Sequence, residues 1–227
     1  KLKPTDIKGR DGTSSWSWDI DALVGNLGNS YKIMECGMKA CPTEALTHTH
    51  LSCLLNAMIG NNLNYTDIKE VQVTCFAQAY DILFDPTKYR PESRETADHS
   101  LPYCLAAAMV DKKITTESFS DEKLNDPRIY EVIDKIKGQP SQEFEKMFPA
   151  KQPSKVVVTT NDGRQFEEYL EYPKGDPREP MTMDDLENKF NSLVGDKLND
   201  DQKKQLKNTI FNCEEMSAND FMTALNI

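Results

Sequence analysis

Residues 155–172, KVVVTTNDGRQFEEYLEY, contain the clearest strand signal in the chain. The first six residues are rich in β-branched side chains, which pack well on a pleated sheet. Asn161-Asp162-Gly163 then supplies a turn, and aromatic residues mark a returning segment at Phe166, Tyr169 and Tyr172. A short turn between two such segments predicts an antiparallel hairpin. We therefore expect a sheet built around these residues.

Helix and strand patterns follow one another irregularly before the hairpin. Apolar residues between 51 and 58 recur at helical spacing, and Gly60-Asn61-Asn62 supplies a stop, which predicts a helix over about 45–60. The alternation of apolar and polar residues over 70–75 predicts a half-buried strand. The almost wholly apolar, alanine-rich residues 101–110 favour a buried helix.

Proline and glycine mark the boundaries of other segments. Asp126-Pro127 predicts the start of a helix, and Gly138 its end. Residues 85–91 predict an irregular loop, because two prolines lie among polar residues. An extended segment is expected over 31–39. The proline-rich residues 172–180 predict a connector.

Beyond this connector the sequence pattern is helical. Thr182 and Asp185 have the spacing of a capping box, and apolar residues continue at helical spacing to Leu225. A shorter helical stripe runs from Ile20 to Leu27. Helices surround a small antiparallel sheet instead of alternating with parallel strands, so the predicted fold class is α+β, followed by a helical tail.

The charge balance excludes some classes of partner. The chain has 227 residues, with 27 Lys and Arg against 37 Asp and Glu, which gives a formal net charge of −10. Nucleic-acid binding needs clustered cationic surface, so no nucleic-acid partner is expected. The longest apolar stretch, Leu105 to Val110, is too short to cross a bilayer, so no membrane span is expected.

The six cysteines show no C-x-x-C spacing, so they do not indicate a zinc or redox site. They are Cys36, Cys41, Cys53, Cys75, Cys104 and Cys213. Several lie in apolar runs, where a free cysteine acts as a small buried hydrophobe. Free thiols fit a reducing compartment, and no charged leader with an apolar core opens the chain, so secretion is not expected. No metal is expected.

One short segment gathers groups that can bind an anion. Lys39, His48 and His50 lie within twelve residues, with Glu44 between them. A helix that begins near Thr43 would add the partial positive charge of its N-terminus, and imidazoles exchange protons near neutral pH. The same residues can equally be ordinary cap and surface residues. The His-x-His spacing alone does not make a metal site.

The remaining histidine lies in Asp98-His99-Ser100, which superficially resembles a hydrolase triad. Adjacent residues cannot form a proton relay, because a triad needs side chains that converge from separate elements. Asp98 or Ser100 is more simply the N-cap of the helix that follows, with Pro102 in its first turn.

Residues 89–103, YRPESRETADHSLPY, resemble the signature of the MmgE/PrpD family. That family includes 2-methylcitrate dehydratase, cis-aconitate decarboxylase and iminodisuccinate epimerase. The resemblance extends from about Trp18 to the C-terminus, and the form of Arg94–Tyr103 is closer to the dehydratase branch. Other segments match in the same order: Lys39 with Pro42 and His48, the turn at 161–163, and residues 172–181.

The resemblance implies a domain organisation. Family members are about twice as long and combine a large all-helical domain with a smaller α+β lid. It implies that residues 1–30 end the helical domain and connect it, that 31–178 form the lid domain, and that 179–227 are C-terminal helices that pack on the helical domain. The N-terminal helical half, which carries Asp and His residues usually assigned to catalysis, is expected as a missing part or a separate subunit.

The resemblance also implies an activity. We expect a hydro-lyase that dehydrates 2-methylcitrate or a related tricarboxylate by acid/base β-elimination, without a cofactor. Lys39 and His48 match catalytic and substrate-binding positions, and His50 is close enough to be the binding histidine instead. The pocket is expected to be cationic at Lys39 and the imidazoles. The alternatives are a decarboxylase or epimerase of the same family, or a non-catalytic interaction module that keeps the lid fold.

The expected partners follow from the same resemblance. They are a small tricarboxylate substrate, the N-terminal helical half, and a second copy in a homodimer. The expected location is the cytoplasm, or the mitochondrial matrix in a eukaryote. Without its helical half, this chain is expected to be inactive.

Overall fold

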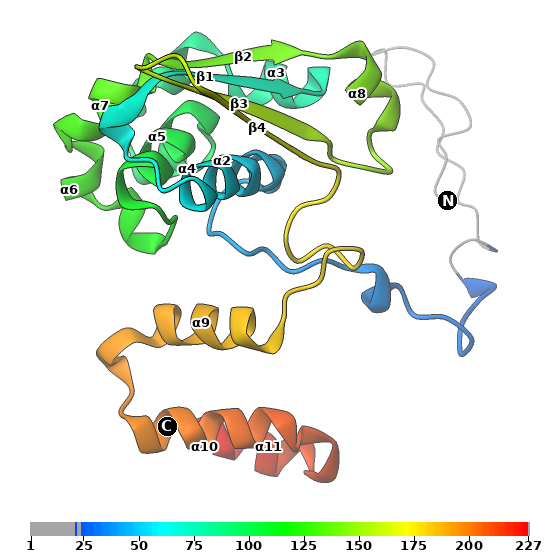
Figure 1. Ribbon diagram of the computed structural model, residues 1–227. Coiled ribbons are helices and arrows are strands. Elements are labelled where there is room, and N and C mark those ends of the chain that lie inside the picture. The colour runs from blue at the N-terminus through cyan, green and yellow to red at the C-terminus, as the bar shows by residue number, and fades with distance from the viewer. Residues whose placement is uncertain (1–20, 22–23, 227) are drawn as a thin grey trace, which may run out of the picture.

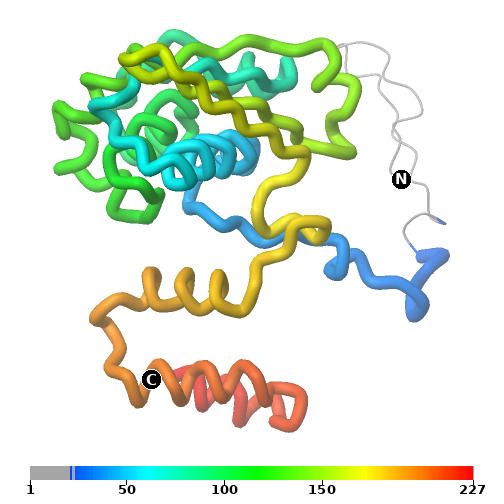
Figure 2. Tube along the Cα trace, in the orientation of Figure 1, coloured from blue at the N-terminus to red at the C-terminus, as the bar shows by residue number. Residues whose placement is uncertain are grey.

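The computed structural model describes residue 21 and residues 24–226, and it shows an α+β protein (Figures 1 and 2). The strands are β1 (Ile68–Cys75), β2 (Ile136–Pro140), β3 (Ser154–Thr160) and β4 (Gln165–Leu170). The α-helices up to the sheet's last strand are α2 (His48–Gly60), α3 (Ala77–Leu83), α4 (Arg94–Asp98), α5 (Leu101–Asp111), α6 (Asp121–Leu124), α7 (Pro127–Ile133) and α8 (Gln142–Met147). The tail contains α9 (Met183–Val194), α10 (Asp200–Phe211) and α11 (Ala218–Ala224).

Short 3-10 helices fill several of the connections. They are Lys32–Glu35, Ala45–Thr47, Tyr65–Asp67, Pro86–Tyr89, Thr116–Phe119, Gly195–Lys197 and Cys213–Glu215. Two of them fall in segments for which the sequence predicted a different structure. The segment 31–39, expected to be extended, contains Lys32–Glu35, and the loop 85–91 contains Pro86–Tyr89. Asp85 accepts a hydrogen bond from Thr87 N, and proline suits the first helical turn, so this sequence favours a short turn.

The four strands form one sheet in the order β2-β1-β3-β4. β3 and β4 form the predicted antiparallel hairpin, and β3 also pairs antiparallel with β1. β2 pairs parallel with β1, so the sheet is mixed instead of wholly antiparallel. The α+β class is confirmed.

β2 replaces the last part of a predicted helix. The helix that begins at Pro127 ends at Ile133, and Ile136 and Gly138 lie in the strand. Gly138 is therefore a strand residue and not a helix stop. A Cβ at this position would lie 2.6 Å from the ring of Phe84, so glycine lets that ring pack directly on the strand backbone.

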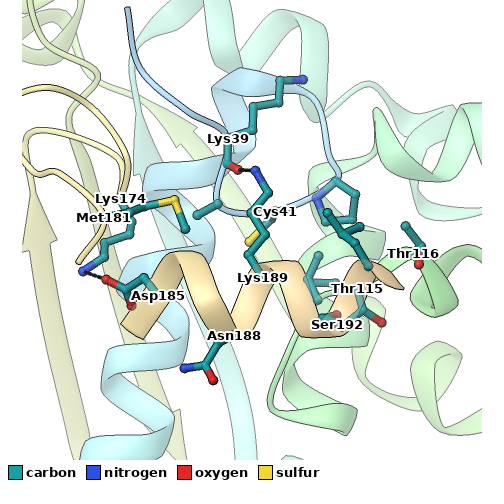
Figure 3. Close-up of a pocket in the computed structure, with 14 residues that line it drawn as sticks. Lys39, Cys41, Thr115, Thr116, Lys174, Met181, Asp185, Asn188, Lys189 and Ser192 are labelled. Carbon is teal, nitrogen blue, oxygen red and sulfur yellow. Dashed lines mark hydrogen bonds and ion pairs between the residues drawn. The ribbon is translucent and has the colours of Figure 1, made fainter. Parts of the chain in front are cut away.

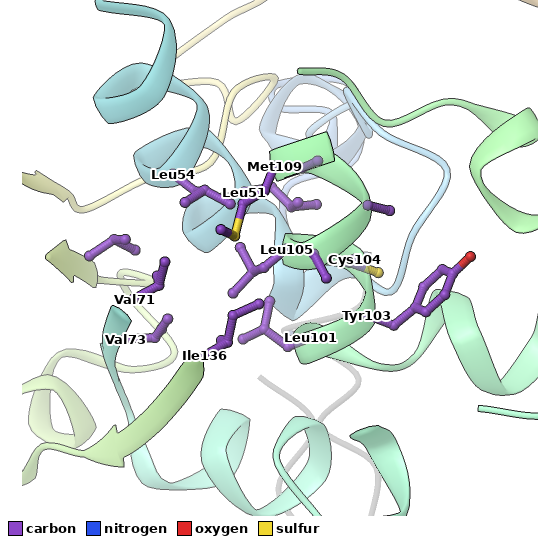
Figure 4. Close-up of a cluster of buried hydrophobic side chains, with 14 of the residues drawn as sticks. Leu51, Leu54, Val71, Val73, Leu101, Tyr103, Cys104, Leu105, Met109 and Ile136 are labelled. Carbon is purple, nitrogen blue, oxygen red and sulfur yellow. The ribbon is translucent and has the colours of Figure 1, made fainter. Parts of the chain in front are cut away.

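The core lies between one face of the sheet and two long helices (Figure 4). α2 contacts β3, β4 and α5, while α5 also contacts α7 and β2. The predicted helices over 45–60 and 101–110 are confirmed, and both are largely buried. The central residues have no exposed side-chain surface or almost none; they include Leu51, Leu54, Val71, Val73, Leu101, Leu105 and Ile136. Each such aliphatic side chain contributes roughly 1.5–3 kcal/mol by leaving water.

The tail helices form no comparable core of their own. α9 and α11 have no buried residue, and α10 has only Thr209. Large apolar side chains remain exposed, among them Met183, Leu193, Ile210, Phe211 and Met222. The capping box of Thr182 and Asp185 at the start of α9 is confirmed. The predicted stripe from Ile20 to Leu27 lies partly outside the described residues.

None of the helices within the described residues combines the length and apolar character that a bilayer crossing requires. The six cysteines, all within the described residues, carry free thiols. Cys53, Cys75 and Cys104 are buried as expected for small hydrophobes, whereas Cys36 and Cys213 are exposed.

Candidate functional site

The segment before α2 brings Lys39 and His48 to the same backbone group. Lys39 Nζ donates a hydrogen bond to the carbonyl oxygen of Thr43 at 2.8 Å, and His48 Nε2 lies 3.4 Å from that oxygen. The Thr43 and Thr47 hydroxyl groups are hydrogen-bonded to each other at 2.7 Å. Glu44 accepts from Leu46 N and caps the short 3-10 turn that leads into α2. The turn therefore fixes the start of the helix beside the lysine.

His48 is a neutral imidazole at physiological pH. Its side chain is buried, and this burial lowers its pKa from 6.5 to about 4, although the Thr43 carbonyl opposes the change. The nearby charges of Lys39 and Lys189 lower the pKa further. The expectation that imidazoles add positive charge to the pocket is therefore corrected. A neutral imidazole offers one hydrogen-bond donor and one acceptor.

His50 lies in the core and not in the pocket with Lys39. It has no exposed surface, and its Nδ1 is 2.5 Å from the hydroxyl oxygen of Ser154 on β3. Burial lowers its pKa to about 3. Residues 48 and 50 point to different sides of α2, because consecutive helical residues are separated by about 100° around the axis. Of these two histidines, only His48 lines the pocket with Lys39.

Lys39 and His48 line a pocket of about 230 Å³. The pocket is closed on other sides by Gln152, which precedes β3, and by the connector residues Lys174, Gly175 and Asp176. Three segments that are distant in the sequence therefore meet here. Asp176 is held by Arg178, with Nε and Oδ1 2.7 Å apart, so its negative charge is already paired. Lys174 is likewise paired, because its Nζ lies 2.8 Å from Asp185 Oδ2, so the positive charge that this pocket offers is that of Lys39.

A close contact between two backbone segments shapes the pocket. Met38 N donates to the carbonyl oxygen of Gly175 at 2.8 Å. Gly175 has a φ of +94°, and a Cβ added there would lie only 1.9 Å from the Met38 carbonyl oxygen. Only glycine allows both this backbone conformation and this approach. Gly175 therefore places Lys174 next to the segment that carries Lys39.

A second hollow, of about 450 Å³, lies between the Lys39 segment and α9 (Figure 3). Lys189 Nζ donates to the Lys39 carbonyl oxygen at 2.7 Å, while the Lys39 side chain extends away from Lys189. Lys174 Nζ lies 2.8 Å from Asp185 Oδ2. The two hollows share Lys39 and Lys174 as lining residues, so α9 holds both lysines from one side.

Lys174 and Gln152 are site residues that the sequence did not identify individually. Lys174 lies in the segment 172–181 that carried part of the resemblance, but no physical signal separated it from other exposed lysines. Gln152 lies in an irregular stretch before β3, where neither spacing nor periodicity marks a function. Both enter the pocket only through tertiary contacts.

The other candidates from the sequence remain apart from this pocket. His99 is exposed and is hydrogen-bonded to its neighbour Asp98, and Ser100 is the N-cap of α5. No group of three His, Cys, Asp or Glu side chains in the described part of the chain is arranged to hold a metal ion.

Known proteins match this chain over most of its length. The model of the MmgE/PrpD C-terminal domain matches residues 41–214. The chain is 22% identical over 204 residues to the cis-aconitate decarboxylase of Aspergillus terreus, which covers 87% of this chain and 41% of that protein. It is 27% identical over 135 residues to the mouse cis-aconitate decarboxylase and 28% identical over 141 residues to the human one. Each of these matches covers 60% of this chain and 28% of the relative.

The chain thus spans less than half the length of these curated relatives. The matched domain includes Cys41 to Glu214, and so contains α2, the whole sheet and most of the tail. Because this match covers well over half of the sequence, the chain belongs to the MmgE/PrpD family.

Proposed function

We propose that this chain forms the lid side of an MmgE/PrpD lyase active site, and that the substrate is a polycarboxylate such as cis-aconitate. The observation that carries the proposal is the convergence of Lys39, His48 and Lys174 on one pocket. A carboxylate that leaves water needs charged or hydrogen-bonding partners. Lys39 can provide one, and Lys174 can provide another by exchanging its present partner, Asp185, for the substrate. The form of the Arg94–Tyr103 segment favoured 2-methylcitrate as the substrate. The curated relatives are cis-aconitate decarboxylases, and they support cis-aconitate instead.

Decarboxylation places clear demands on such a pocket. Loss of CO2 breaks a carbon–carbon bond and leaves an electron pair on the substrate, which a proton then neutralises. Positive charge beside the remaining carboxylates stabilises the negative charge that develops, and such stabilisation is commonly the largest catalytic contribution. In our proposal Lys39 and Lys174 bind these carboxylates. Lys39 also carries a proton that it can donate, while the His48 ring nitrogen that does not face the Thr43 carbonyl accepts a hydrogen bond.

Dehydration of 2-methylcitrate is the second candidate function. It requires a base that removes a proton next to a carboxylate while an acid assists the departure of hydroxide. His48 is the candidate base of the lid, because its imidazole is unprotonated at pH 7, but a pKa near 4 makes it a weak one. In either reaction Lys39 and His48 are the catalytic and binding residues of the lid.

The complete enzyme, in this proposal, includes an N-terminal helical half and is a homodimer. The tail supports the presence of a helical half, because α9 to α11 expose several large apolar side chains that an adjoining helical domain would cover. The proposed partner surface is therefore the tail, and the proposed substrate site is the pocket between the Lys39 segment and the connector that leads to the tail.

The test is a product assay on the natural full-length protein with cis-aconitate and 2-methylcitrate in parallel. We expect release of CO2 from cis-aconitate, and loss of this activity in Lys39→Ala. Lys155→Ala is the matched control, because Lys155 pairs with Glu167 on the sheet, outside the pocket. Turnover of 2-methylcitrate alone would select the second candidate. Unchanged activity and ligand affinity in both Lys39→Ala and His48→Ala would contradict the catalytic assignment and favour the non-catalytic module.

A further inference from the structure

The guanidinium group of Arg178 makes three kinds of contact at once. Its Nε and Nη2 donate to the two carboxylate oxygens of Asp176 at 2.7 and 2.8 Å, and its Nη1 donates to the carbonyl oxygen of Ala150 at 2.6 Å. The guanidinium carbon lies 4.0 Å from the centre of the Tyr172 ring, within the range of a cation–π contact. Arginine presents its donors in a planar fork, so a lysine could not make the same set of contacts.

These contacts fix a turn of the connector. Gly175 N donates to the carbonyl oxygen of Glu179 at 2.8 Å, and Glu179 N donates to the carbonyl oxygen of Asp176 at 2.9 Å, so the chain folds back on itself here. Arg178 ties this turn to Ala150, which lies shortly before β3. The turn and the carboxylate that it carries are therefore held in place relative to the start of β3.

The residue that Arg178 holds belongs to the candidate pocket. Within the described part of the chain, Asp176 is the one acidic residue that lines this pocket, and Arg178 itself does not line it. Hydrogen bonds from Arg178 hold the pKa of Asp176 below its usual value, so this carboxylate is ionised at neutral pH. Without a partner, a carboxylate beside Lys39 would repel an anionic ligand or would pair with Lys39 itself.

We propose that Arg178 is a positioning residue of the candidate site, which holds the Asp176 carboxylate so that Lys39 stays available to a polycarboxylate. This inference rests on the proposed function and deepens it. Arg178 does not touch the ligand; it acts through Asp176. Because the effect is electrostatic, removal of the Asp176 charge should make Arg178 dispensable for binding.

The test measures the Kd of tricarballylate, a saturated tricarboxylate without a hydroxyl group, by calorimetry on the full-length protein. Arg178→Met leaves the Asp176 carboxylate without its partner, and the Kd is expected to rise about tenfold. Arg178→Met combined with Asp176→Asn removes both charges, and the Kd is expected to return to within about twofold of the unmodified value. A Kd that stays high in the double variant would overturn the proposal, because Arg178 would then act by shape alone.

Arg128→Met is the matched control. Arg128 pairs with Asp126 at the same spacing of two residues, with Nε and Oδ1 3.0 Å apart and Nη2 and Oδ2 2.6 Å apart. Neither residue lines the pocket, so the Kd is expected to stay unchanged in this variant.

The dependence on salt gives a second readout that a structural role would not move. Dissolved ions screen charges, so the ratio of the Kd in Arg178→Met to the Kd in the unmodified protein is expected to fall as the salt concentration rises. A ratio that is independent of salt would contradict the electrostatic role of Arg178.

Asp176→Asn alone keeps the test decisive if Arg178→Met fails to fold. This variant keeps one side-chain oxygen that can accept from Arg178, and it removes the negative charge. The Kd of tricarballylate is therefore expected not to rise. A raised Kd would show that the ligand needs the Asp176 carboxylate, which would overturn the proposal.

The outcome for Lys39 keeps this inference distinct from the proposed function. If Lys39→Ala weakens tricarballylate binding and Arg178→Met leaves it unchanged, the inference about Arg178 fails and the proposed function stands. If Lys39→Ala also leaves binding unchanged, both fail.

Discussion

The ammonium group of Lys189 donates a 2.7 Å hydrogen bond to the backbone carbonyl oxygen of Lys39, 150 residues earlier in the chain. One helical turn before Lys189, Asp185 pairs with Lys174 at 2.8 Å. Residues four apart lie on the same face of a helix. One face of α9 therefore contacts both segments that bring a lysine to the candidate pocket (Figure 3). We infer that α9 positions these lysines.

The first prediction concerns Lys189. Its charge lowers the pKa of His48, so Lys189→Met is expected to raise that pKa, which a titration of the His48 ring by NMR measures. The variant also loses the hydrogen bond that holds the backbone of Lys39, which contributes about 1 kcal/mol. The Kd of tricarballylate, a saturated tricarboxylate that serves as the probe, is therefore expected to rise several-fold. Lys197→Met, in the exposed turn after α9, is the control and should change neither quantity. If both quantities stay the same in Lys189→Met, α9 does not position Lys39.

The second prediction concerns the close contact of Gly175. Gly175→Ala is expected to be strongly destabilising, because it forces a Cβ into a positive φ and against the Met38 carbonyl oxygen. Gly163→Ala is a matched control, since Gly163 has a φ of +88° but no heavy atom within 4 Å of the added Cβ. The backbone conformation alone costs about 1–3 kcal/mol. Urea unfolding should therefore show a larger loss for Gly175→Ala, and equal losses would argue against the contact.

Local sequence patterns predicted those elements whose turns, caps and apolar spacing lie within a few residues of one another. The hairpin turn at Asn161-Asp162-Gly163, the apolar stretch of α5 and the capping box at Thr182 each carry their own signal, and each is confirmed. Lys39, His48 and His50 were first singled out as groups that can bind an anion, and the resemblance then matched Lys39 and His48 to family positions. Their shared pocket was not predictable from spacing, because it depends on residues more than 100 positions away, such as Gln152 and Lys174.

The errors have a common physical cause. Ile136 and Gly138 follow a helical pattern closely enough to extend it, but pairing with β1 makes them a parallel strand. Likewise, His48 and His50 look equivalent in the sequence, and only packing against β3 places one in the core. In both cases tertiary contacts decide between local alternatives that the sequence leaves nearly equal.

The third prediction tests the reassignment of Gly138 to a strand. Gly138→Ala is expected to destabilise the protein by about 1–3 kcal/mol, because the new Cβ overpacks the ring of Phe84. In a Phe84→Leu background the same substitution should cost less, since the smaller side chain can move away. A double-mutant cycle by urea unfolding measures this coupling. Additive losses would show that Phe84 is not what excludes a side chain at Gly138.

The fourth prediction is a loss of stability in acid that comes from His48 and His50. Burial lowers their pKa values to about 4 and about 3, below the value of 6.5 for an exposed imidazole. Between these values the unfolded chain binds more protons than the folded one, so acid favours unfolding. The stabilisation is complete above pH 6.5 and is lost as the pH falls towards the folded values.

From pH 7 to pH 5 the free energy of unfolding should fall by about 2 kcal/mol for each of these two histidines. Urea titrations at both pH values measure the fall. His99→Gln is the control, because it removes an exposed imidazole instead of a buried one. His50→Phe should remove about half of the fall, since His48 alone then remains buried. A fall of the same size in His50→Phe and in the unmodified chain would mean that His50 has an ordinary pKa, and that its burial against Ser154 is wrong.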